Sequence, residues 1–408
     1  MGFDWNKIKG VIKGDRVIWF VLMALSLFSL VIVYSATGKL AFNEAGGNTF
    51  TYLWKHFIKM FVGFLFILGI VNITPVRFYS KFANIILLVA IALLYVATLQ
   101  HFIFHTPTNR SLDLGITSFQ PAEIAKISLV IYVSKILATH REGNHVSRKG
   151  FRKVLIASAL VLLPIALGDS STALILALAI FAIMIIAGVK AKTLFFTVSS
   201  AVLTLAILIL ISPILPAKFG RIHTVRERII DFAIGDEHEQ QGTTQAQYSQ
   251  LAIYEGGVTP LGKGVGNNDV SNYIEAAYSD FIFAIIIEEG GIVTAIIILL
   301  AYLIILFRGG AIAVRSKRSF PAFLVTGLVL MYTIQAFVNM MVATGLFPVT
   351  GQPLPFLSYG GTSIVFTSAA FGIVLAVSEE TRKKPAPPSE SQLIITDPDE
   401  DEEIKQEL

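Results

Sequence analysis

The sequence predicts an all-α polytopic membrane protein with about ten transmembrane helices and one large extracytoplasmic loop. Of its 408 residues, 54% are hydrophobic and only 15% are charged, and the apolar residues lie in long uninterrupted runs. Soluble globular proteins carry about 25% charged residues, whereas a helix that crosses a bilayer needs about 20 mostly apolar ones. The composition therefore excludes a soluble enzyme, and no polar stretch is long enough to form a globular domain of its own.

Ten apolar runs predict the individual helices in order. They cover about 17–35, 56–74, 82–104, 120–138, 153–168, 172–189, 194–215, 281–307, 320–344 and 362–378. Each run is close to the length that crosses the hydrocarbon core of a membrane. We therefore predict a ten-helix membrane domain over 17–380, preceded by a short polar segment (1–16) and followed by an acidic tail (381–408).

Basic residues gather on one side of this predicted bundle. They precede the first run and follow the second, fourth, sixth, eighth and tenth, as at Lys7, Arg77, Arg148, Lys190, Arg315 and Lys383. By the positive-inside rule both termini are cytoplasmic. Topology thus accounts for the net charge of +4, which gives no evidence for a nucleic-acid partner. The tail is too polar to offset the entropy of folding and is expected to be disordered.

A segment of about 216–279 separates the seventh and eighth runs on the outer side. Loops of this length in compact proteins are usually functional or disordered, and the glycines between Gly256 and Gly266 favour a folded, re-entrant loop. Topology does not explain its basic residues, among them Arg221, Arg226 and Lys263. They are either solvated surface charges or ligands for a diphosphate. Lys263 is the sharper candidate, because its flanking glycines let backbone amides approach an anion.

Ionisable residues inside apolar runs are costly and mark pairs, pathways or reactive sites. Glu123 and Lys126 lie three residues apart on one helix face, where a packing salt bridge and a functional role are both open. Asp169 lies at an outer turn, where it either caps a helix or orients a basic residue that contacts a substrate. Glu288 and Glu289 need partners such as Lys126 or loop amides.

Asp280 stands at the predicted start of the eighth helix. A carboxylate at the boundary between water and lipid is partly desolvated, which suits a general base. The alternative is that Ser279 or Asp280 caps the helix.

The last outer segment, 339–363, contains three prolines and four glycines. It cannot form a continuous helix, and exposed backbone at membrane depth is tolerated only beside protein or a watery cavity. We therefore expect this segment to wall a cavity on the outer face.

Four blocks together resemble motifs of the SEDS family (shape, elongation, division and sporulation), whose members are polytopic peptidoglycan glycosyltransferases. The blocks are 118–126, 245–266, 275–289 and 339–363. The resemblance covers almost the whole membrane part, and the charged tail is more similar to the division branch than to the elongation branch. Departures are Arg110-Ser111 in place of Arg-Trp, an altered turn at Asp169, and Tyr273-Ile274-Glu275 in place of Leu-Pro-Glu.

The resemblance implies an inverting glycosyltransferase that polymerises lipid II at the outer face of the bacterial inner membrane, at the division septum. Asp280 would be the catalytic carboxylate that deprotonates the acceptor's 4-hydroxyl. The substrate- and diphosphate-binding residues would be Lys263, Arg221, Arg226, Arg110, Glu123, Lys126, Asp169, Gln245, Glu275 and Ser358.

The expected partners are lipid II, undecaprenyl-linked glycan, a class B penicillin-binding transpeptidase and other divisome membrane proteins. A divalent cation, Mg²⁺ or Mn²⁺, is the candidate cofactor for the leaving diphosphate. A lipid II flippase and a non-catalytic divisome scaffold are the alternative functions. The clustering of ionisable residues towards the outer face favours chemistry there over transport.

Overall fold

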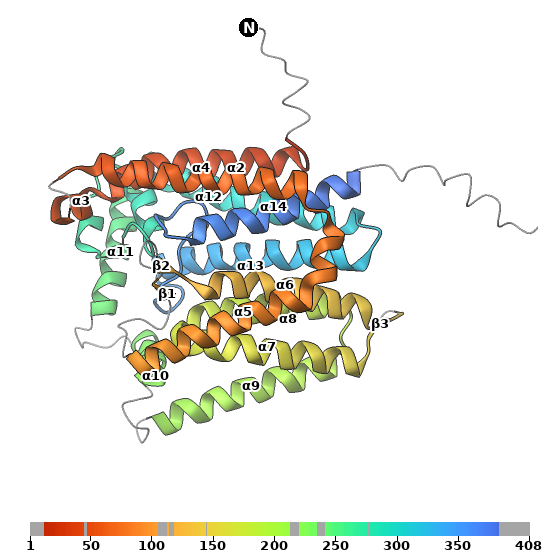
Figure 1. Cartoon of the computed structure of the whole chain (residues 1–408). Helices are drawn as coiled ribbons and strands as arrows, with labels where there is room; N and C mark the ends of the chain where they lie inside the picture. The colour runs from red at the N-terminus through yellow and green to blue at the C-terminus, as the bar shows by residue number, and fades with distance from the viewer. Residues whose placement is uncertain are drawn as a thin grey trace, which may run out of the picture.

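Each of the ten predicted apolar runs coincides with one helix, and these helices lie side by side (Figure 1). The computed structural model describes residues 12–44, 47–104, 112–113, 118–143, 145–212, 220–234, 241–275 and 277–382. Within these ranges the ten helices are α2 (Arg16–Ala36), α4 (Thr49–Ile73), α5 (Val76–Phe104), α6 (Pro121–Thr139), α7 (Arg148–Gly168), α8 (Ser170–Ile186), α9 (Ala191–Ile211), α12 (Ile282–Arg315), α13 (Ser319–Ala343) and α14 (Ser363–Arg382).

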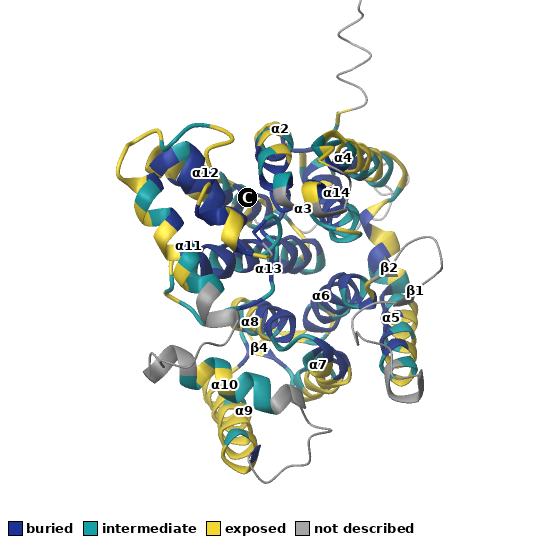
Figure 2. Ribbon diagram, turned by 90° about the vertical axis from the view of Figure 1, so that its left-hand side faces the viewer, coloured by how far each residue is buried: buried dark blue, intermediate teal, exposed yellow. Residues whose placement is uncertain are grey.

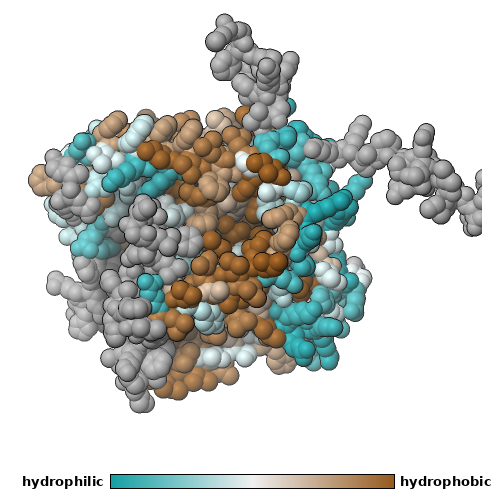
Figure 3. Space-filling model, in the orientation of Figure 1, coloured by the Kyte–Doolittle hydropathy of each residue, from teal (hydrophilic) through white to brown (hydrophobic). Residues whose placement is uncertain are grey.

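Eight of these helices, in the part of the chain that the structure describes, are long and apolar enough to cross a membrane. The other two are α8, which has 17 residues, and α6, which carries Glu123, Lys126 and Lys135. In Figure 3 a broad apolar belt lies beside a hydrophilic end at the right, and a smaller hydrophilic patch lies at the upper left. The all-α polytopic membrane fold is therefore confirmed, while the crossing of the bilayer by α6 and α8 stays a prediction.

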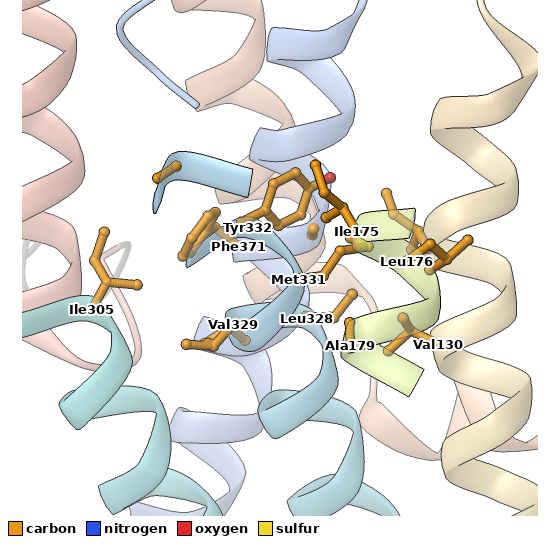
Figure 4. Close-up of a cluster of buried hydrophobic side chains, with 14 of the residues drawn as sticks. Val130, Ile175, Leu176, Ala179, Ile305, Leu328, Val329, Met331, Tyr332 and Phe371 are labelled. Atoms are coloured by element: carbon orange, nitrogen blue, oxygen red, sulfur yellow. The ribbon is translucent and has the colours of Figure 1, made fainter. Parts of the chain in front are cut away.

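The core lies around α13, which is buried along most of its length and packs against α6, α8, α12 and α14 (Figures 2 and 4). The rings of Tyr332 in α13 and Phe371 in α14 lie 5.8 Å apart. Helix α9 is the opposite case, because Leu194 is its only buried residue. Its exposed apolar side chains suit a helix that faces lipid on most sides.

The two ends of the bundle differ in character. One end, here called the basic end, holds the start of α2, the end of α14 and short connections such as the hairpin of β3 (Arg141–Glu142) and β4 (His145–Val146). The other end, here called the loop end, holds the longer connecting segments (Figure 1). These are α3 (Gly38–Glu44), the antiparallel strands β1 (Leu112–Asp113) and β2 (Ser118–Phe119), α10 (Gly220–Ile234), α11 (Gln241–Gly257) and the 3₁₀ turn η3 (Ser271–Tyr273).

Helix α12 is not the continuous span that the run 281–307 predicts. Gly291 interrupts it with a φ of 69°, and the segment 259–264 fits into the break. There the amides of Lys263 and Gly264 donate to the carbonyls of Glu288 and Glu289, both at 2.9 Å, and the carbonyl of Pro260 accepts from Val293 at 3.2 Å. The inserted segment thus satisfies backbone groups that a break at membrane depth would otherwise leave free.

Of the long segment 216–279, the structure describes residues 220–234, 241–275 and 277–279, and much of this part is helical. It contains α10, which packs against α9, and α11, which packs against α12. At the other end of the chain α14 continues to Arg382, two residues into the predicted tail. The expectation of a disordered tail concerns residues 383–408, and the expectation of a cytoplasmic N-terminal segment mainly 1–11; both lie outside the described residues.

Candidate active site

Asp280 lies in a turn at the loop end, immediately before α12. Phe281 is the N-cap residue of α12, so the helix begins later than the capping interpretation of Ser279 or Asp280 places it. The Ser279 hydroxyl donates to Asp280 Oδ1 at 2.8 Å, and Asn339 Nδ2 donates to the carbonyl of Asp280 at 2.7 Å. The turn that carries the half-buried Asp280 is therefore held in place by Ser279 and Asn339.

The segment 344–362 packs directly on this turn. Ser358 is the link, because its hydroxyl donates to the carbonyl of Ser279 at 2.6 Å and accepts from the amide of Leu354 at 2.7 Å. One residue further on, the amide of Tyr359 donates to the carbonyl of Tyr278 at 2.9 Å. The structure thus brings Ser358 to Asp280, as the proposed site requires.

Asn339 ties the same two segments together from α13. Besides the carbonyl of Asp280, its side-chain amide donates to the carbonyl of Gln352 at 2.8 Å. Asn339 is 1% exposed, so water does not compete strongly for these bonds. One buried side chain therefore sets the position of the Asp280 turn relative to the loop.

Side chains of α2 and α4 also hold the loop, and sequence reasoning missed them: Ser29 of α2 and Lys59 of α4 bond to it, and His56 of α4 bonds to Ser29. The Ser29 hydroxyl donates to the carbonyl of Leu357 at 2.9 Å and lies 2.8 Å from His56 Nε2. A hydroxyl has one proton to donate, so His56 Nε2 is the donor in the second bond. Lys59 Nζ donates to the carbonyl of Gly360 at 3.0 Å. The available signal was a histidine and a lysine inside an apolar run.

Asp169 caps α8, accepting from the amides of Ser171 and Thr172 at 3.1 and 3.2 Å. Gln352 Nε2 also donates to Asp169 Oδ2 at 3.1 Å. The capping interpretation is confirmed, and the contact connects Asp169 to the loop that covers Asp280. Its proposed role in orienting a basic residue stays a prediction.

Glu123 and Lys126 form a salt bridge of 2.8 Å inside the bundle, with the lysine side chain 2% exposed. Lys126 Nζ also lies 5.7 Å from the centre of the Tyr332 ring. Glu123 and Asp169 line one small cavity of about 40 Å³. The predicted pair is therefore confirmed, and it lies close to Asp169.

Glu288 does not pair with Lys126. It binds the segment 216–279 instead. Its carboxylate accepts from the amides of Val270 and Ser271, both at 3.0 Å, and from the Ser271 hydroxyl. Lys263 Nζ contacts Glu255 and lies 3.3 Å from Glu288 Oε1. The hydrogen bond with Glu255, with support from Glu288, raises the pKa of Lys263.

The amides beside Lys263 do not form the predicted anion cradle. Those of Lys263 and Gly264 already donate to carbonyls of α12, because the break at Gly291 leaves those carbonyls without helical partners. The Lys263 ammonium, whose side chain is 27% exposed, is the part of this residue that faces a cavity.

Two cavities connect these groups at the loop end. One of about 1090 Å³ is lined by Ser35, Glu255 and Lys263. The other, of about 280 Å³, is lined by Glu275 and Tyr278. Asn268 and Asn272 line both, so Lys263 and Glu275 line adjoining spaces, and the smaller one reaches Tyr278, two residues before Asp280.

The remaining predicted residues are less closely connected to Asp280. Gln245 is half-buried on α11, and Arg226 is half-buried on α10. Arg110 and the side chain of Arg221 lie outside the described residues. Among the residues that the structure describes, no group of three or more His, Asp or Glu side chains could hold a metal ion; the expected divalent cation stays a prediction.

The family model of FtsW, RodA and SpoVE, described as cell cycle protein, matches residues 15–383. The chain belongs to this family. The probable peptidoglycan glycosyltransferase FtsW of Buchnera aphidicola is 30% identical to this chain, and the match covers 91% of this chain and 90% of that protein. The peptidoglycan glycosyltransferase MrdB of Escherichia coli K12 is 29% identical, with 91% and 94% covered.

A solved structure of the same architecture supports the fold of this SEDS protein. It concerns the coordination of polymerisation and crosslinking by a peptidoglycan synthase complex. The similar chain has a TM-score of 0.70 at 22% identity, and the match covers 91% of this chain and 99% of that one. The polytopic fold predicted from the apolar runs is thus a known fold.

Proposed function

We propose that this SEDS protein is a peptidoglycan glycosyltransferase that polymerises lipid II, with Asp280 as the general base. The observation that carries the proposal is the Asp280 turn itself. Asn339 and Ser358 fix the backbone of this turn against the loop 344–362, and Asp280 itself is half-buried. A positioned, partly accessible carboxylate is what proton abstraction from a sugar hydroxyl needs.

In this mechanism Asp280 takes the proton of the acceptor's 4-hydroxyl while that oxygen attacks the anomeric carbon of the lipid-linked donor. The bond from the anomeric carbon to the diphosphate breaks, and the configuration at that carbon inverts. The leaving group carries its negative charge into the cavity beside Lys263. The Lys263 ammonium would stabilise the developing anion once a diphosphate oxygen replaces part of its contact with Glu255.

Lys263 serves this role through its side chain. Glu255 and Glu288 hold the ammonium at the cavity wall, and a diphosphate would take over part of its hydrogen bonding. Arg221 and Arg226 of α10 are the further candidates for diphosphate binding. A divalent cation coordinated by the diphosphate oxygens would neutralise part of the leaving group's charge, and no step of the mechanism depends on it.

The basic end would face the cytoplasm and the loop end the outer side, where lipid-linked disaccharide is used. Orientation follows from the basic connections on one end of the bundle and the positive-inside rule.

A class B penicillin-binding transpeptidase and other divisome proteins are the proposed membrane partners, and the division septum is the proposed site of action. The assembly shown for the related synthase complex supports a partner of this kind.

Purified protein in liposomes with lipid II, with and without the transpeptidase, tests the function. We expect glycan strands on gels, made from lipid II in the leaflet next to the loop end. Transport of labelled lipid II across the bilayer without any polymer would overturn the proposal in favour of a flippase. If the protein produces no polymer and transports no lipid II even with the partner present, the result would favour a scaffold.

A further inference from the structure

At the basic end, far from Asp280, a cavity of about 990 Å³ opens between α7 and α9. Its mouth is formed by the β3–β4 hairpin and the turn between α8 and α9, and carries Arg148, Lys190 and Lys192. Leu155 of α7 and Ala201 of α9 line its deeper part. At 1.5 Å per helical residue they lie about 10 and about 15 Å further into the bundle than the mouth.

The mouth carries an excess of positive charge. Arg148, Lys190 and Lys192 are exposed, and within the described part of the chain no ion pair is recorded for them. Glu142 is the acidic residue of the lining, and His145 uses Nδ1 to contact the carbonyl of Gly188 at 3.3 Å. An anion at this mouth would meet three cationic side chains and one carboxylate.

The walls below the mouth are largely apolar, with Phe151, Leu155 and Phe196 beside the smaller polar residues Thr193, Thr197 and Ser200. Leu155 and Phe196 are both more than 40% exposed, and α9 stands at the edge of the bundle with most of its surface uncovered (Figure 2). An occupant that suits both parts has an anionic head and hydrocarbon chains.

We propose that this cavity binds one anionic phospholipid. Its phosphate lies among Arg148, Lys190 and Lys192, and its acyl chains lie between α7 and α9. The proposal rests on the orientation given above, which places the mouth at the inner leaflet, and it does not depend on the catalytic assignment. The bound lipid would fill the space beside α9 and fix that helix, which α8 and α10 otherwise contact only lightly.

Basic residues at this end could also serve topology alone, and the turn between α12 and α13 offers the matched control. Arg315, Lys317 and Arg318 are exposed at the same end and carry the same total charge, but they do not line this cavity. A topology signal predicts equal lipid binding by the two clusters, whereas a built site predicts a difference.

Native mass spectrometry of the purified full-length protein measures this difference, with phosphatidylglycerol, phosphatidylcholine and undecaprenyl diphosphate as probes. We expect one phosphatidylglycerol to be retained in preference to phosphatidylcholine. The triple variant Arg148→Gln/Lys190→Gln/Lys192→Gln should lose affinity on the order of 100-fold, given the usual contribution of each cation near anionic lipid. The triple variant Arg315→Gln/Lys317→Gln/Arg318→Gln should keep it.

Ala201→Trp provides a second test that changes no charge. Because Ala201 lines the deeper part of the cavity and is exposed, the indole should block the acyl chains and weaken binding without unfolding the protein. Equal losses in both triple variants, normal binding by Ala201→Trp, or no preference over phosphatidylcholine would overturn the proposal. Preferential retention of undecaprenyl diphosphate would also overturn it, because the cavity would then belong to the substrate.

Discussion

Asn339 joins Asp280 to the loop that covers it, through two hydrogen bonds from one buried amide. The sequence indicated Asp280 and Ser358 as site residues, but it did not show that Asn339 connects them. Such a link depends on three segments meeting in space, and no spacing along the chain encodes it. For the same reason Ser29 and Lys59, which donate to the loop from α2 and α4, were not predicted.

Asn339→Ala should reduce both stability and turnover. Loss of two buried hydrogen bonds should lower the free energy of unfolding by about 1–3 kcal/mol, and the released Asp280 turn should lower the polymerisation rate per folded molecule. Thermal unfolding in detergent and a lipid II polymerisation assay measure the two effects.

Gln335→Ala is the control for this prediction. Gln335 also lies buried on α13 and donates to the same loop, at the carbonyl of Pro353, 2.8 Å away. It should lose stability but keep its turnover per folded molecule. If the two variants lose turnover equally, Asn339 has no special role in positioning Asp280.

At the scale of elements, the apolar runs located the ten helices of the bundle in the described part of the chain, but not the break in α12. A run of hydrophobic residues predicts a segment in the membrane, but it does not predict whether the helix is continuous. The signal for the break was the pair Gly290-Gly291, whose meaning depends on the segment 259–264 that fits beside it. Likewise the glycines around Lys263 suggested an anion site, whereas their use here is close backbone packing against α12.

Gly291→Ala should destabilise the protein by about 2 kcal/mol or more. The left-handed conformation of Gly291 is costly for alanine, and an added Cβ would collide with the backbone of Pro260 and Gly262. Faster hydrogen exchange at the amides of Lys263 and Gly264, together with a lower melting temperature, would report the displaced segment.

Gly310→Ala in the same helix is the matched control. No atom lies within 4 Å of a Cβ added there, so alanine should raise stability by about 0.4–1 kcal/mol. Equal destabilisation by the two substitutions would mean that the break at Gly291 does not hold the outer segment.

At the scale of the whole molecule, the two ends of the bundle carry different features. The basic end carries the short connections and the proposed lipid cavity, while the loop end carries Asp280, Lys263 and the Glu123–Lys126 pair. The composition predicted this membrane fold directly. The sequence predicted the site only in part, because the hydrogen bonds that hold the Asp280 turn come from residues more than fifty positions away along the chain.

Cysteine labelling tests the orientation, since the chain contains no cysteine of its own. Tyr254→Cys in α11, 73% exposed at the loop end, should react with an impermeant maleimide in spheroplasts. Lys317→Cys, exposed at the basic end, should react only after the membrane is permeabilised. The reverse pattern would contradict the placement of the site on the outer side.

The rate at which purified Asp280→Asn protein polymerises lipid II tests the central claim most directly. The amide keeps the size of the side chain but cannot accept the proton. We therefore predict a fall in rate of at least about 100-fold, with lipid II binding and melting temperature close to wild type. Glu380→Gln, an exposed carboxylate at the basic end, should leave the rate unchanged. Polymerisation by Asp280→Asn at the wild-type rate would contradict the assignment of Asp280 as the general base.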